Sequence, residues 1–154
     1  MKRSAWAWLN VIFFLIMVIL NILANAVPFN GLRTGEVSDL YPSLFTPGGV
    51  TFSIWSAIYL LLAGFCLYQW KMFVKEGNYT LRQYTELSLW FILSCILNMS
   101  WLFAWHYLFT GLSVMIMLLL LFTLTRIFLF LDKQERNYLL EKLFIHLPFT
   151  IYLA

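Results

Sequence analysis

The amino-acid sequence predicts an all-α integral membrane protein, a single domain of residues 1–154 folded as a bundle of about five transmembrane helices. Three observations predict it: an extreme apolar composition, long stretches almost free of charge, and basic residues concentrated on one side. Apolar residues make up 62% of the 154 positions and charged residues only 11%, whereas soluble domains carry about 25% charged residues. A chain this small cannot hide so much apolar surface, so its solvent must be lipid.

Apolar stretches with few charged residues set the expected helices. A spanning helix needs about 20 apolar residues. The long charge-free stretch 87–125 fits two spans joined by a turn at 106–111. The predicted helices lie near 5–27, 49–70, 87–106, 112–131 and 139–154.

The fifth helix is short. Its residues 139–154 reach about 24 Å at the α-helical rise, against a hydrocarbon core of about 30 Å. It is either a partial span or a truncated one, and the sequence favours truncation.

The basic residues predict the orientation. Cytoplasmic loops carry the excess of Lys and Arg. Arg33, which shares its loop with Glu36 and Asp39, is the one exception among ten basic residues. We therefore expect a cytoplasmic N-terminus and an external loop at 28–48. The other nine are Lys2, Arg3, Lys71, Lys75, Arg82, Arg126, Lys133, Arg136 and Lys142.

A signal peptide is the competing interpretation of the N-terminus. Lys2-Arg3, an apolar run and Ala24-Asn25-Ala26 have the order of a cleavable signal. The apolar segment is long enough to span a bilayer, however, which favours a retained helix.

The same residues exclude other classes of function. The net charge is only +3, and the basic side explains it, so nucleic acid is not an expected partner. Cys66 and Cys95 have no zinc or disulfide spacing and are expected to be buried thiols. His106 and His146 lie too far apart for a strong metal hypothesis. With no acidic pair in the spans and no Ser-His-Asp spacing, no enzyme is expected.

Asparagines form a polar face on the first helix. Asn10, Asn21 and Asn25 project within about 60° of one another. Polar residues in a bilayer face protein or a cavity. Hydrogen bonding between helices is the favoured explanation, and a share in a ligand pocket is the alternative.

The helix at 87–106 has the strongest pattern. Trp90, Ser94, Asn98, Trp101 and Trp105 project within about 80° on one face. Indole N–H groups with a hydroxyl and an amide give a mostly apolar surface with a few directed donors, as in small-molecule sites. Aromatic packing is the preferred explanation for Trp90 and Trp105. For Asn98 and Trp101, pocket and packing are equally supported.

The helix at 49–70 offers a facing surface. Phe52, Trp55, Tyr59 and Cys66 share one side, and the Tyr59 hydroxyl can reach the next helix or a ligand. Between them, these faces give the candidate ligand-binding residues. They are Trp55, Tyr59, Asn98, Trp101, Asn21 and Asn25.

Two further segments frame that site. The helix at 112–131 has no polar residue from 114 to 122 and is expected to face lipid, with Arg126 snorkelling at its end. The loop 28–48 is expected to form a lid with a short apolar helix around Leu40 and Phe45, capped by Ser38.

Short motifs in a fixed order resemble the TspO/MBR family, the tryptophan-rich sensory or translocator proteins. Trp55 and Tyr59 match a W-x-x-x-Y motif whose helix closes on Trp70-Lys71, and Leu97-Asn98 with Trp101 matches L-N-x-x-W. Pro47 also precedes its helix as in the family. Residues 21–111 carry most of the resemblance, which is greatest to the longer bacterial members.

The resemblance implies a five-helix bundle in a bacterial cytoplasmic membrane. It implies a pocket for hydrophobic ligands such as porphyrins, lined by Trp55, Tyr59, Asn98 and Trp101 beneath the first loop. A tetrapyrrole is then a ligand and no cofactor is required. The partners implied are the lipid bilayer and the small molecule, and a homodimer is left open.

Three positions depart from the family pattern. Ala63 stands where a glycine is expected, although Gly64 follows, and the fourth helix lacks an acidic residue. The chain also ends at residues 151–154, where the family's fifth helix supplies a tryptophan, so a wall of the pocket is expected to be missing.

Two classes of function remain. One is a receptor or carrier for tetrapyrrole-like molecules. The other is a structural or assembly protein whose aromatic faces only pack helices together. An unfilled cavity between the first three helices separates the two.

Overall fold

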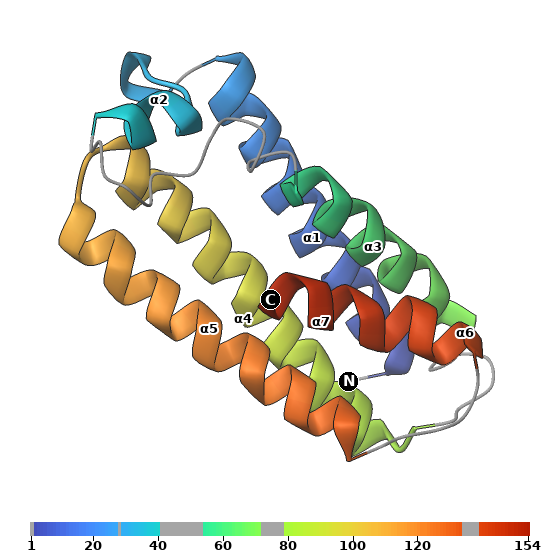
Figure 1. Cartoon of the computed structure of the whole chain (residues 1–154). Helices are drawn as coiled ribbons and strands as arrows, with labels where there is room; N and C mark the ends of the chain where they lie inside the picture. The colour runs from blue at the N-terminus through green and yellow to red at the C-terminus, as the bar shows by residue number, and fades with distance from the viewer. Residues whose placement is uncertain (1, 28, 41–53, 72–78, 134–138) are drawn as a thin grey trace.

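The protein is a helical bundle (Figure 1), seen in a computed structural model that describes residues 2–27, 29–40, 54–71, 79–133 and 139–154. Within those ranges it contains helices and no strand. The elements are α1 (Arg3–Ala26), the 3₁₀ turn η1 (Phe29–Gly31), α2 (Thr34–Asp39), α3 (Ile54–Gln69), α4 (Leu81–His106), α5 (Thr110–Asp132), α6 (Leu139–Glu141), the π-helical stretch η4 (Lys142–His146) and α7 (Leu147–Leu153).

Three helices are long and apolar enough to cross a membrane: α1, α4 and α5. The described part of α3 is a shorter apolar helix of 16 residues. The described ranges therefore confirm the predicted all-α fold, and these helices have the length and apolar composition that membrane spans need. Large apolar side chains along α1 and α5 face outward, as contact with lipid requires.

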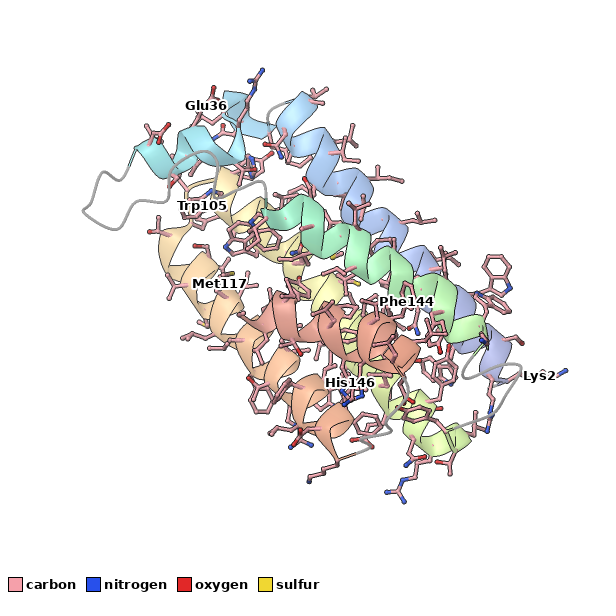
Figure 2. The ribbon with its side chains drawn as sticks, turned by 45° about the vertical axis from the view of Figure 1, so that its right-hand side comes forward. Lys2, Glu36, Trp105, Met117, Phe144 and His146 are labelled. Carbon is pink, nitrogen blue, oxygen red and sulfur yellow. The ribbon has the colours of Figure 1, made fainter. Side chains whose placement is uncertain are left out.

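The central helix of the bundle is α4, which packs along α5 on one side and α1 on the other. Helix α3 packs against α1 and α7, and α7 also touches α5. Figure 1 shows the chain ending near the middle of the bundle, beside α4 and α5. The bundle has two ends. We call them the α2 end and the N-terminal end, where Figure 2 shows Glu36 and Lys2, respectively.

Helix α4 begins at Leu81, six residues before the expected start at 87. Thr80 and Gln83 form a reciprocal capping box there, in which the Gln83 N–H donates to the Thr80 hydroxyl over 3.2 Å. The charge-free criterion missed this turn because Arg82 and Glu86 lie in it. Helices α1 and α5 begin within two residues of the expected positions, and residues 49–53 of the second predicted span, 49–70, lie outside the described ranges.

The fifth segment is one continuous helical run, with the π-helical stretch η4 ahead of a proline. Pro148 opens α7 and has no N–H to donate to the preceding turn, which fits the wider spacing there. Gly64 of α3 lets this segment come close, since a Cβ there would lie 3.0 Å from Cδ1 of Phe144. Ala63 stands where the family pattern has a glycine, and here the next residue, Gly64, allows the close approach of the fifth segment.

The first loop contains a helix earlier than expected. Helix α2 starts after Arg33, whose backbone N–H donates to the Glu36 carboxylate over 2.7 Å. Ser38 is buried inside α2 and caps no start there, so that part of the lid prediction is wrong. Asn30 and Gly31 adopt positive φ in the turn before it. The remainder of the expected lid helix, from residue 41 on, lies outside the described ranges.

Candidate functional site

A cavity of about 810 Å³ lies at the α2 end of the bundle. It is bounded by the last turns of α1, by α2, by the first turns of α3 and by α4. Five of the six predicted site residues line it: Trp55, Tyr59, Trp101, Asn21 and Asn25. The other described residues that line it are Ile22, Ala26, Arg33, Thr34, Gly35, Glu36, Asp39 and Ser56.

Stacked indoles form the wall of this cavity. Trp55 of α3 stacks on Trp101 of α4, with ring centroids 5.9 Å apart and planes at 16°. Trp101 stacks in turn on Trp105, also at 5.9 Å and with planes at 19°. The Tyr59 ring lies 6.1 Å from Trp55. A row of aligned aromatic faces beside an open volume is a surface on which a flat apolar molecule can stack.

Asn98, the sixth predicted residue, lies beneath the cavity rather than on its surface. Its side chain is fully buried. The Asn21 amide donates to its oxygen over 2.9 Å, and its own amide donates to the Tyr152 hydroxyl over 3.0 Å. Asn98 therefore ties α1, α4 and α7 together under the site.

Tyr152 is a site residue that sequence reasoning missed. Besides its bond to Asn98, its ring packs edge-on against Trp55, with centroids 6.2 Å apart. It packs behind Trp55 rather than lining this cavity. Nothing in the local sequence marked it, because its partners are 54 and 97 positions away.

Tyr59 carries the one unsatisfied polar group of the cavity wall among the described residues. Its hydroxyl is buried and lies near Asn98, yet it makes no hydrogen bond of standard geometry. A buried hydroxyl without a partner is unfavourable by about 1–3 kcal/mol.

Helix α2 is held over the mouth of the cavity by the end of α4. The Trp105 indole N–H donates to the Thr34 carbonyl over 3.1 Å, and Nε2 of His106 lies 3.4 Å from the Thr34 hydroxyl. The Asn30 amide donates to the His106 carbonyl over 3.2 Å, and Phe29 stacks on Phe103. His106 is thus used to hold the roof of the cavity.

Charged groups reach the mouth from α2. Arg33, Glu36 and Asp39 line the cavity and are all exposed. In the sequence, Arg33 is the one basic residue on the predicted external side. Its isolated position was the available sign that charged residues lie at the mouth of the cavity.

The remaining asparagine of the predicted polar face has a different role. Asn10 is fully buried toward the N-terminal end, and its amide donates to Gln69 over 2.9 Å and to Ser88 over 3.1 Å. The Tyr84 hydroxyl donates to the same Gln69 oxygen over 2.9 Å. Interhelical hydrogen bonding therefore explains Asn10.

The contacts of Trp90 fit the aromatic packing that its position in the sequence favours. Its ring meets Phe122 edge-on at 6.2 Å and carries the Arg126 guanidinium 5.5 Å above its centroid. Cys66 and Cys95 are buried free thiols, as expected. Among the residues that the structure describes, no three His, Cys, Asp or Glu side chains gather as a metal site would require.

Comparison with known proteins finds a family model described as TSPO-like protein, which matches residues 7–154. No curated protein and no solved structure matches the chain.

Proposed function

The chain belongs to the family of TSPO-like proteins, and from that premise we propose that it is a membrane receptor or carrier for a hydrophobic planar ligand such as a porphyrin. The ligand occupies the cavity at the α2 end. Membership makes the chain an integral membrane protein of the TspO type. The identity of the ligand is the proposed part.

The observation that carries the proposal is the stacked pair Trp55 and Trp101 beside an open volume of about 810 Å³. Small-molecule pockets measure about 300–1,000 Å³ and combine apolar walls with few polar groups. A planar ring can lie against the indoles, while the Asn21 and Asn25 amides meet its polar edge. This pattern supports binding rather than catalysis.

The alternative is a protein whose aromatic faces only pack helices. It requires the space between α1, α3 and α4 to be filled at the α2 end. The open cavity favours the receptor over this alternative.

The basic asymmetry supports an orientation in which the N-terminus is cytoplasmic and α2 lies outside. The ligand then enters from the external side. Cysteines placed at the exposed residues Asp39 and Lys133 test this in a Cys66→Ser/Cys95→Ser background. An impermeant thiol reagent applied to intact cells should label the cysteine at 39 and spare the one at 133. The reverse labelling would overturn the orientation.

A fluorescence titration tests the binding itself. Purified protein in lipid nanodiscs is titrated with protoporphyrin IX while tryptophan emission is followed. Saturable quenching at one ligand per chain is expected, because the ligand stacks on Trp55 and Trp101. Nanodiscs that contain a free indole in the lipid and no protein are the control, and their quenching should rise linearly with added porphyrin. The same linear rise with the protein would reject the proposal.

A further inference from the structure

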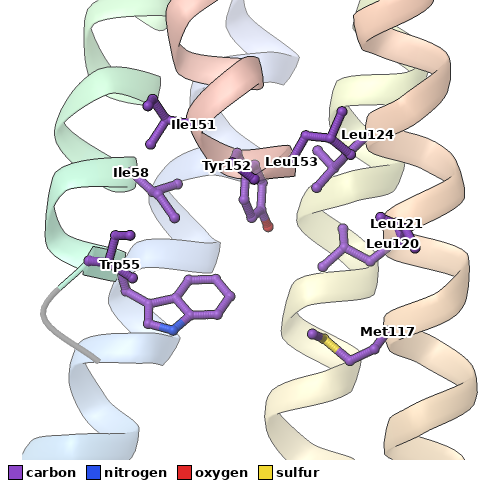
Figure 3. Close-up of a pocket in the computed structure, with 11 residues that line it drawn as sticks. Trp55, Ile58, Met117, Leu120, Leu121, Leu124, Ile151, Tyr152 and Leu153 are labelled. Atoms are coloured by element: carbon purple, nitrogen blue, oxygen red, sulfur yellow. The ribbon is translucent and has the colours of Figure 1, made fainter. Parts of the chain in front are cut away.

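A second cavity, of about 370 Å³, opens between α3, α5 and α7 (Figure 3). None of its lining side chains is charged. Figure 3 shows the Trp55 indole reaching into it from α3, with Met117 and Leu120 across from it on α5. The lining residues are Ile54, Trp55, Ile58, Met117, Leu120, Leu121, Leu124, Ile151, Tyr152, Leu153 and Ala154.

This side cavity opens on the surface of the bundle that faces lipid. Ile54, Met117 and Leu121 at its edge are 52%, 40% and 51% exposed. The outward residues beside them on α5, such as Leu118, are apolar as well. From Met117 to Leu124 the cavity follows about 10 Å of α5.

Water is a poor occupant of such a space. A water molecule needs two to four polar partners, and apolar cavities stay dry. An empty groove is also unfavourable, because the side chains that line it lose dispersion contacts on one side. The medium in contact with this surface is hydrocarbon, which supplies those contacts without any polar partner.

We propose that the side cavity holds one acyl chain of a bilayer phospholipid. Its uncharged side chains, its run of about 10 Å along α5 and its opening toward the bilayer fit a single hydrocarbon chain. The headgroup would stay at the membrane surface. The proposal does not rest on the ligand proposed for the α2 end.

Trp55 links the two sites, since it lines both cavities. One part of its indole stacks on Trp101, and Tyr152 supports it edge-on. The acyl chain fills the space on the α5 side of the indole. Occupancy of the side cavity therefore helps to hold Trp55 against Trp101.

Quenching by brominated phospholipid tests the acyl-chain site. The protein is placed as a single copy in nanodiscs of lipid brominated midway along its chains, in a Trp101→Phe background that removes the stacked indole. Subtracting the emission of the Trp55→Phe variant isolates Trp55. We expect bromine to quench the Trp55 emission by more than half. Equal emission in brominated and plain lipid would overturn the proposal.

Two matched pairs of substitutions locate the contact. Met117→Phe with Leu121→Phe fills the mouth of the side cavity, whereas Met115→Phe with Leu119→Phe makes the same change on outward residues of α5 outside the cavity. The first pair should remove at least half of the quenching and the second should leave it unchanged. Equal effects of the two pairs would contradict the site. If the Met117→Phe/Leu121→Phe variant melts at a lower temperature than the parent, the comparison of Trp55 emission in brominated and plain lipid still tests the proposal.

A second copy of the chain is the other occupant to exclude. The same measurement is repeated in vesicles at a high protein-to-lipid ratio. Quenching of Trp55 should persist there. Its loss at high density would show that another chain covers this face and would reject the lipid as occupant.

Discussion

Two asparagines on one face of α1 lie in opposite surroundings. Asn10, toward the N-terminal end, is fully buried and hydrogen-bonds to Gln69 and Ser88 of two other helices. Asn21, near the α2 end, bonds to Asn98 and also lines the large cavity. The same residue type is part of a packed core in one place and of a pocket wall in the other.

The course of the fifth segment explains the difference. Segments α6, η4 and α7 pack beside α3 and α5 toward the N-terminal end, and Tyr152 of α7 meets Asn98. Phe149 and Ile145 are fully buried there. On the α2 side of Tyr152, the indoles of Trp55 and Trp101 line the open cavity between α1, α2, α3 and α4. Among the described residues, the bundle thus has a packed half and a hollow half.

The largest expected effect is on stability, in the packed half. Gln69→Leu removes the acceptor shared by Asn10 and Tyr84 in the buried network. We expect a loss of about 2–3 kcal/mol in the free energy of unfolding, from buried donors that lose their partner. Asn25→Leu, at an exposed residue bonded only within α1, should cost less than about 0.5 kcal/mol. Unfolding in detergent measures both, and equal losses would contradict the division.

The next effect concerns the close approach of α3 to η4. Gly64→Leu should cost about 1–3 kcal/mol, because its side chain would overlap Phe144. Ala57→Leu, at an exposed position of the same helix, is the control and should be nearly neutral. Phe144→Ala should recover most of the loss at Gly64. No recovery in the double variant would mean that Phe144 does not set the contact.

A smaller effect is expected on ligand affinity, in the hollow half. Trp101→Phe keeps most of the aromatic volume but loses stacking area, and porphyrin affinity should fall by about 1–2 kcal/mol. Trp90→Phe makes the same change on the same helix outside the cavity, and its affinity should equal that of the parent. Nanodisc titrations give both values, with melting curves to show that both variants fold. If Trp101→Phe binds porphyrin as tightly as the parent does, the Trp101 indole has no role in binding.

The smallest effect concerns the contact between α4 and α5. Arg126→Gln removes the cation above the Trp90 ring and should lower stability by about 0.5–1 kcal/mol. In a Trp90→Leu background the same change should cost nothing measurable. A double-mutant cycle from unfolding curves measures the coupling, and a coupling near zero would mean that the ring contact contributes nothing.

Sequence patterns were sufficient for the helices and for much of the pocket. The apolar stretches identified α1, α4 and α5, and helical spacing put Asn98 and Trp101 on the face that meets Trp55 and Asn21. These are properties of single helices, and a period of 3.6 residues determines them. The early start of α4 was missed because a capping box can extend a helix through charged residues.

Features that depend on contacts between distant segments could not be predicted. Tyr152 approaches Asn98 only once the fifth segment has folded back on α4. Asn10 and Asn21 project alike along α1, so their different roles arise from the helices that surround them. The position of α2 over the cavity depends on Trp105 and His106 of α4, about 70 positions away in the chain.

The affinities of Asn10→Leu and Asn21→Leu for protoporphyrin IX test the division of the bundle most directly. The two variants make the same change on the same face of α1. Asn21→Leu should weaken binding about tenfold, the equivalent of one lost hydrogen bond, while Asn10→Leu should bind within twofold of the parent even though it melts at a lower temperature. Equal weakening by both variants, or none by either, would contradict a packed half that stabilises the fold and a hollow half that binds the ligand.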